Sequence, residues 1–161
     1  MRSDQQAPTA TVTTPTDREI HIERVFDAPR DRVFAAFLDP KLIPEWWGPT
    51  TIVDQMDVRP GGSWRFVIHN ADGSETAFRG TYREVTPPER IVQTFEWEGM
   101  PGHVHDQTAT FEDLGDRTKL TTTLLFHTTE ERDGLLASDM ERGMNETYAR
   151  LDELLARLAS R

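Results

Sequence analysis

Cysteine is absent from the 161 residues of the chain, which excludes disulfides, thiolate metal sites and a cysteine nucleophile. Long apolar runs are also missing: no stretch of about 18 apolar residues occurs, so the sequence predicts no membrane span. The first residues have neither a basic start nor an apolar core, which argues against a secretory signal. We therefore expect a cytoplasmic protein that has no membrane partner.

Positive charge is scarce, because 18 Lys and Arg residues stand against 28 Asp and Glu residues and leave a net charge of −10. Nucleic acid repels such a protein unless basic residues are concentrated in one patch. The densest candidates, Arg24, Arg30 and Arg32, are interleaved with acidic residues, as on an ordinary solvated surface. We expect no nucleic-acid partner. P-loops, dinucleotide-binding glycine patterns and a Ser/His/Asp order are absent from the sequence as well.

The length fits one domain. Residues 1–18 are rich in Gln, Thr, Ala and Pro and show no apolar periodicity, so we expect a flexible tail followed by a single domain over residues 19–161. An extra edge strand at residues 11–14 is the alternative, because Thr and Val favour strands, although Pro8 and Pro15 bracket it.

Alternating apolar residues predict a first strand from Glu19, and two proline-containing start signals then predict two short helices that end at Gly48-Pro49. Turn chemistry divides the middle of the chain into six strand-like segments. These are residues 51–58, 63–69, 76–86, 90–97, 104–112 and 117–126. In the first of them we expect Ile52, Met56 and Val58 to share a face.

The last segment opens with a capping box at Thr128 and Glu131, and apolar residues recur every three or four positions from Leu136 to Leu158. This pattern predicts one helix of about eight turns. Such a helix must lie across a sheet to bury its stripe, which predicts an α+β fold with a seven-stranded, curved antiparallel sheet wrapped around the helix. A cavity can remain between the two layers. Gly143 within the helix indicates that bulk is unwelcome there.

Several segments resemble a known family in both order and spacing. They are FDAPRDRVFAAFLDPKLIPEWWGP (26–49), MDVRPGGSWRFV (56–67), GTYREVTPPERIV (80–92) and TATFEDLGDRTKLT (108–121). The chain is similar to bacterial proteins related to the C-terminal domain of the activator of Hsp90 ATPase, in the wider superfamily of START-like and Bet v 1-like (SRPBCC) domains. The resemblance implies the helix-grip fold. It also implies a hydrophobic or amphipathic small molecule in the cavity, while some relatives are cyclases or hydrolases and the namesake stimulates a chaperone.

The candidate ligand-binding residues are mostly aromatic and lie on the strand faces, on the second short helix and on the long helix. They are Trp46, Trp47, Trp64, Phe66, Phe78, Tyr82, Phe95, Trp97, Met140, Gly143, Met144 and Tyr148. The candidate polar groups of the cavity are His69, His105 and Gln107. The tandem tryptophans cannot both face inward, so we expect one to anchor the helix and the other to line the cavity.

Metal and acid/base chemistry have weaker signals. His103 and His105 project from one strand face, but a metal site needs a third convergent ligand. Glu96 points outward if Phe95 and Trp97 point inward. We therefore expect no metal, no cofactor and no catalytic residue. The leading hypothesis is binding of a small hydrophobic or amphipathic ligand; an enzyme that uses the same cavity, a chaperone-associated interaction domain and a homodimer stay open as alternatives.

Overall fold

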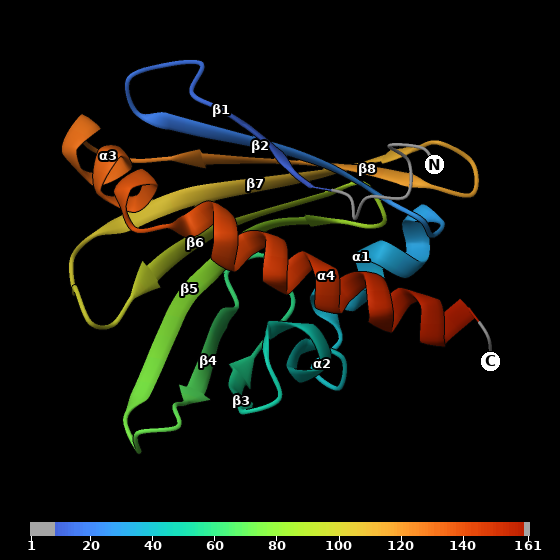
Figure 1. Ribbon diagram of the computed structural model, residues 1–161, viewed down its shortest axis with the longest axis horizontal. Coiled ribbons are helices and arrows are strands. Elements are labelled where there is room, and N and C mark those ends of the chain that lie inside the picture. Colours follow the sequence, from blue (N-terminus) through green and yellow to red (C-terminus); the bar gives the residue numbers. More distant parts are fainter. Residues whose placement is uncertain (1–8, 160–161) are drawn as a thin grey trace, which may run out of the picture.

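The computed structural model describes residues 9–159 as one antiparallel sheet with helices on its concave side (Figure 1). The strands are β1 (Thr11–Thr13), β2 (Glu19–Phe26), β3 (Thr51–Met56), β4 (Ser63–His69), β5 (Glu75–Thr86), β6 (Arg90–Trp97), β7 (Val104–Asp113) and β8 (Thr118–Leu125). They are ordered β1-β2-β8-β7-β6-β5-β4-β3, with every neighbouring pair antiparallel. The helices are α1 (Arg30–Leu38), α2 (Ile43–Trp47), α3 (Thr129–Ala137) and α4 (Met140–Ala159). This is the expected α+β helix-grip architecture.

Side chains that alternate between the two faces of the sheet form the core on one of them. In β2, buried and half-buried residues alternate along the whole strand, so that Ile20, Ile22 and Phe26 face α4. The paired β8 alternates in the same way and contributes Leu120 and Leu124. Because side chains point to opposite faces with a period of two, one face of the sheet is apolar and packs on α4, while the other carries polar residues.

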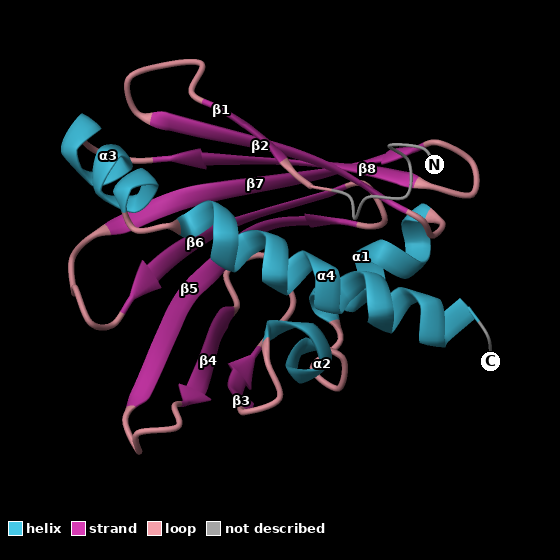
Figure 2. Ribbon diagram, in the orientation of Figure 1, coloured by secondary structure: helices cyan, strands magenta, loops and turns pink. Residues whose placement is uncertain are grey.

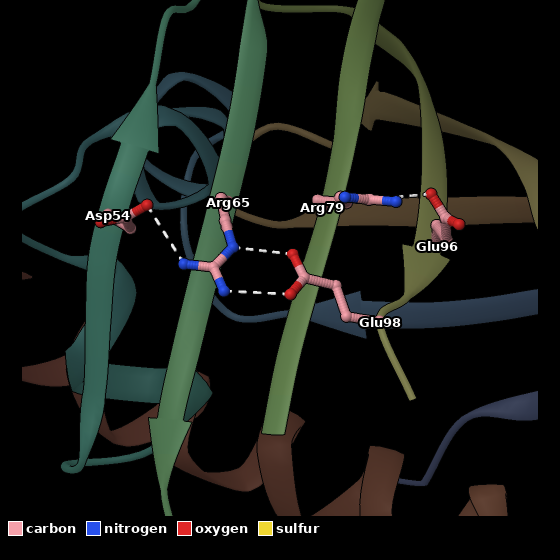
Figure 3. A network of polar contacts seen from close by, with 5 residues as sticks. All are labelled: Asp54, Arg65, Arg79, Glu96 and Glu98. Carbon is pink, nitrogen blue, oxygen red and sulfur yellow. Dashed lines mark hydrogen bonds and ion pairs between the residues drawn. The ribbon is translucent and has the colours of Figure 1, made fainter. Parts of the chain in front are cut away.

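The convex face is held by ion pairs that cross the strands. Arg65 on β4 donates to both carboxylate oxygens of Glu98 at 2.7 and 3.0 Å and to Asp54 on β3 at 3.2 Å (Figure 3). On the neighbouring strands, Arg79 donates to Glu96 at 3.0 Å. This bond places Glu96 on the outer face, as alternation with its neighbours predicts.

The sheet has one strand more than the sequence analysis expects. Thr11–Thr13 pair with the outer edge of β2, at Thr11↔Glu23 and Thr13↔His21. The edge-strand alternative therefore describes this part of the predicted flexible tail correctly, and residues 1–8 lie outside the described residues. The Thr-Val-Thr segment pairs because β2 presents an open edge, and Pro15 comes after the last paired residue.

A bulge changes the faces of β3. The register of β3 against β4 shifts between Val53 and Gln55, so Ile52 is 52% exposed while Val53 and Met56 pack on the core. The expectation that Ile52, Met56 and Val58 share a face is therefore wrong for Ile52. A bulge inserts one residue and reverses the alternation beyond it.

The predicted single C-terminal helix is two helices, as Figure 2 shows. Asp139 adopts a φ of 63°, a left-handed conformation that ends the helical path between α3 and α4. The capping box at Thr128 and Glu131 is present. No residue of α3 is buried, whereas α4 buries Tyr148, Leu151, Leu154 and Leu155 against the sheet. None of the helices in residues 9–159 has the length and apolarity that a membrane span requires.

Side-chain bonds to backbone carbonyls fix the short helices to each other and to the middle of α4. The indole Nε1 of Trp46 donates to the carbonyl of Ala36 at 3.0 Å, which joins α2 to α1. Arg150 of α4 donates to the carbonyls of Trp46 and Trp47 at 3.0 and 3.2 Å. Carbonyls at a helix C-terminus lack partners within the helix, so a cation is favoured there. These bonds hold α2 beside α4, as Figure 1 shows.

Candidate functional site

A cavity of about 410 Å³ lies between α4 and the concave face of the sheet. This volume is within the range of small-molecule sites, roughly 300–1,000 Å³. We call it the main cavity. It is lined by Phe37, Ile43, Trp46, Trp47, Phe66, Ile68, Phe78, Tyr82, Ile91, Gln93, Phe95, Gln107, Ala109, Thr122, Gly143, Met144, Thr147 and Tyr148.

Most of the sequence-predicted site residues lie together around this cavity. Those that line it are Trp46, Trp47, Phe66, Phe78, Tyr82, Phe95, Gly143, Met144, Tyr148 and Gln107. They come from α2, β4, β5, β6, β7 and α4, elements that are distant in the sequence and meet only because the sheet curves around α4. The concave-face residues of adjacent strands therefore form the floor and α4 forms the roof.

The tandem tryptophans divide their roles only in part as expected, because both of them line the cavity. Trp46 is 4% exposed and docks on α1 through its indole nitrogen. Trp47 stands over the floor, with its ring centroid 4.9 Å from Phe66 and 5.9 Å from Phe78, in edge-to-face geometry. Both rings contribute to the cavity wall, but only Trp46 is an anchor.

Five predicted site residues do not line the main cavity: Trp64, Trp97, Met140, His69 and His105. Trp64 faces the correct side but is 1% exposed and packs behind Trp47 and Phe95 without lining the main cavity. Trp97 is 45% exposed at the end of β6. Met140 packs on the edge of the core, and His69 is exposed and pairs with Glu75 at 3.3 Å. Trp64, Trp97 and Met140 lie near a strand end or helix start and share a face with the cavity without lining it. His69 follows Ile68, which lines the cavity, and therefore points to the opposite face of the sheet.

The interpretation of Gly143 needs correction. A Cβ atom built on this residue would meet nothing within 4 Å, so space for a side chain exists at this point of α4. The glycine therefore does not mark a tight contact in the wall. Gly143 lines the cavity beside Met144 and is itself exposed, so a side chain at this position has open space around it.

A row of polar side chains crosses the cavity floor, and the sequence analysis identifies only part of it. Tyr82, Gln93 and Gln107 are directly paired across β5, β6 and β7. Gln93 makes no side-chain hydrogen bond within residues 9–159. Thr122 and Thr147 add hydroxyls from β8 and α4. Cross-strand pairing could have identified Gln93 once the register of its neighbours was known.

The cavity wall carries no charge. No Asp, Glu, Lys, Arg or His residue is among its lining residues. Burial raises the pKa of the Tyr82 hydroxyl well above its ordinary value, and burial also raises the pKa of Tyr148, against the opposing effects of a hydrogen bond with Thr122 and the charge of Arg24. Both tyrosines are therefore neutral hydrogen-bonding groups at physiological pH, and the wall as described offers no acid/base pair.

His105 does not line the main cavity but contacts two residues that do, Phe95 and Gln107. Its ring lies between Phe95 and Phe126, with centroid distances of 5.2 and 4.6 Å, and its Nε2 lies 3.0 Å from Gln107 Oε1. Burial lowers the pKa of His105, although the bond with Gln107 acts in the opposite direction. The neutral ring donates to Oε1 of Gln107, which orients the amide NH₂ of Gln107 for another acceptor.

A stability measurement tests the buried state of His105. In the unfolded chain the imidazole takes up a proton as the pH falls through about 6.5, but in the folded chain it resists until a lower pH. We expect the free energy of unfolding to fall as the pH decreases from 7 towards 5, by an amount that is absent from the His105→Phe variant. Chemical denaturation at several pH values measures the difference between the two proteins. Parallel pH profiles would contradict the prediction.

His103 and His105 do not converge on a metal. His103 Nδ1 lies 2.6 Å from Glu131 Oε2 on α3, whereas His105 is bound to Gln107. No group of three or more metal-ligating residues occurs in the part of the chain that the structure describes. The bond from His103 lowers the pKa of Glu131, which stays ionised and completes the capping box. The His103–Glu131 pair therefore joins the β6–β7 loop to α3.

The curved sheet, the long helix across it and the uncharged apolar cavity between them define a helix-grip domain. A solved protein of Rhodobacter sphaeroides has the same fold, with a TM-score of 0.85, 24% identity, and coverage of 92% of this chain and 99% of that one. The Mycobacterium smegmatis protein Ms6760 matches with a TM-score of 0.81 and 23% identity over 92% of this chain and 97% of its own.

The chain belongs to the activator of Hsp90 ATPase homolog 1-like family, whose model matches residues 27–156. An uncharacterized protein of Schizosaccharomyces pombe, C1711.08, is 30% identical over 119 residues, which are 73% of this chain. The match covers 32% of that relative, so the chain spans about a third of its length.

Proposed function

We propose that this protein binds a small hydrophobic or amphipathic molecule in the main cavity. The observation that carries the proposal is an uncharged space of about 410 Å³ that survives between two otherwise packed layers. Apolar cavities of this size cost packing energy in the empty protein, because their lining atoms lack contact partners. A ligand restores these contacts, and the polar row on the floor orients it.

The wall sets the chemistry of the ligand body. Trp47, Phe66 and Phe95 present aromatic faces and edges, which favour a planar apolar group. Tyr82, Gln93 and Gln107 supply neutral donors and acceptors for a hydroxyl or carbonyl group. A charge on this part of the ligand would be desolvated without a counterion. We therefore propose a neutral body with one or two polar groups.

The alternatives have less support. An acid/base enzyme needs convergent titratable groups, and the cavity wall holds only two tyrosines whose pKa values are raised. A chaperone-associated domain or a homodimer needs a continuous apolar surface. The exposed large apolar residues of residues 9–159 are instead spread over β3, the end of β6, the β6–β7 loop, the β7–β8 turn and the end of β8; they are Ile52, Trp97, Met100, Leu114 and Leu125.

Native mass spectrometry of the protein purified from its own host tests the proposal directly. We expect a retained small molecule in a one-to-one ratio with the chain. A thermal-shift screen of neutral aromatic and lipid-like compounds complements it, since a ligand at 100 times its Kd adds about 2.7 kcal/mol of stability. Failure of both, with no adduct and no stabilising compound, would overturn the proposed function.

Filling the cavity from α4 should weaken binding. We expect Met144→Trp to place an indole in the space that the ligand occupies and to weaken a ligand found by the screen at least about tenfold, equivalent to 1.4 kcal/mol. Isothermal titration calorimetry measures the change. The matched control is Glu146→Trp, which adds the same side chain to an exposed position of α4. Equal affinities of the two folded variants would remove Met144 from the binding wall.

A further inference from the structure

A second pocket, of about 450 Å³, lies beneath α3, and we call it the α3 pocket. It is lined by Phe78, Phe95, Trp97, Met100, His103, Val104, His105, Phe126, Glu130, Glu131, Gly134 and Leu135. Phe78 and Phe95 also line the main cavity. The two spaces therefore share a wall, formed by these two rings.

The α3 pocket exposes aromatic surface that core packing does not require. Trp97 is 45% exposed and Met100 is 50% exposed, although both residue types are costly to leave in water. The rings of Phe78 and Phe95 lie 5.3 Å apart on its inner side. Aromatic faces together with a polarizable thioether are the groups that attract an organic cation, because the face of a π system is electron-rich.

The charge at the rim of this pocket is negative. Glu130 and Glu131 in the first turn of α3 line it, and no Lys or Arg is among its lining residues. Glu131 is already engaged by His103 and by the cap, whereas Glu130 has no ion-pair partner within residues 9–159. His105 adds no positive charge, because burial keeps its ring neutral. The partial positive charge of the helix N-terminus, about half an elementary charge, offsets only part of these carboxylates.

We propose that the α3 pocket binds an ammonium group carried by the ligand, with the cation between the half-exposed ring of Trp97 and the carboxylate of Glu130. This inference rests on the proposed function, because the same ligand places its neutral body in the main cavity. The uncharged wall under α4 thus binds the neutral part of one amphipathic cation, and the aromatic, acidic wall under α3 binds its ammonium group. The net charge of −10 attracts such a molecule over a distance.

Two probes of the same shape test the proposal. They are 3-hydroxyphenyltrimethylammonium and 3-tert-butylphenol, which differ only in a nitrogen that replaces a carbon. We expect the ammonium probe to bind about tenfold more tightly, and to lose this advantage at high salt. Titrations followed by NMR locate the binding, because the chain has 4 Trp residues and hence few indole N–H signals. The signal of Trp97, assigned with Trp97→Phe, should shift most.

Variants at the rim separate charge from shape. We expect Glu130→Gln to weaken the ammonium probe about threefold to fivefold and to leave 3-tert-butylphenol unchanged. The matched control is Glu141→Gln, which removes the same charge from an exposed position of α4 outside both pockets. Trp97→Leu should reduce the preference for the cation while the protein stays folded, because its ring is half exposed.

The outcomes are distinguishable. Equal affinity for both probes, or a shift at Trp47 and not at Trp97, would overturn the α3 pocket as a cation site while leaving ligand binding in the main cavity intact. Failure of the ammonium probe to bind, with neutral compounds still stabilising the protein, would contradict the cation site in the same way. If neither these probes nor the neutral screen produces binding, the inference and the proposed function fail together.

Discussion

Replacing Gly80 with alanine is expected to lower the free energy of unfolding by about 3 kcal/mol, because the new methyl group has no room. A Cβ atom at this position would lie 1.9 Å from the backbone oxygen of Thr94 and 2.6 Å from Nε1 of Trp64. The backbone of β6 must then move away from β5. Both strands contribute to the floor of the main cavity. The clash is with backbone and with a fully buried ring, so a rotamer change cannot relieve it.

Chemical denaturation of Gly80→Ala measures this loss, and Gly143→Ala is the control. At Gly143 a Cβ atom meets nothing within 4 Å, so the same substitution should instead stabilise the protein by about 0.5–1 kcal/mol through helix propensity. If Gly80→Ala were as stable as the parent protein, the strands would not approach each other as closely as described.

Asp152→Asn is expected to lower the free energy of unfolding by about 2–3 kcal/mol, because it removes the carboxylate that neutralises a buried guanidinium. Two nitrogens of Arg24 on β2 donate to the two carboxylate oxygens of Asp152 on α4, at 2.7 and 2.6 Å. The Arg24 side chain is 2% exposed and the Asp152 side chain 32%, so water screens the pair only from one side. The guanidinium also stacks over Phe26 at 4.5 Å.

Replacing both partners tests whether charge is the cause. We expect Arg24→Met combined with Asp152→Leu to be more stable than Asp152→Asn alone, since an apolar pair leaves no buried charge behind. Urea denaturation of the two variants and the parent protein measures the difference. If Asp152→Asn cost less than about 0.5 kcal/mol, the pair would behave like an exposed surface bridge and would not anchor α4 to the sheet.

Local patterns in the sequence predict most of the fold. Alternation in β2 and β8, the capping box at Thr128 and the apolar stripe of α4 each follow from neighbours a few positions apart. The break between α3 and α4 does not, because Asp139 adopts a left-handed φ where neither glycine nor proline marks the position. The bulge in β3 cannot be predicted from the sequence either, since one additional residue in a strand does not change its composition recognisably.

The sequence predicts on which face of the sheet a site residue lies, but not whether its side chain reaches the cavity. Alternation groups Phe66, Phe78 and Phe95 correctly, and all three line the main cavity. Trp64 and Trp97 obey the same alternation and miss it, because one is sealed behind other rings and the other lies at a strand end. The depth of a side chain depends on sheet curvature, which is a tertiary property. The grouping of Trp97 with its neighbours in the α3 pocket depends on the position of α3.

The ion pairs on the convex face have a consequence for how this architecture diversifies. Arg65 and Arg79 join their strands from the side opposite Phe66 and Phe78, so these ion pairs do not involve the side chains that line the main cavity. A substitution at an inward position therefore leaves the outer ion pairs in place. The side chains that line the cavity of such a fold can thus differ from one protein to another while the ion pairs on the convex face stay the same.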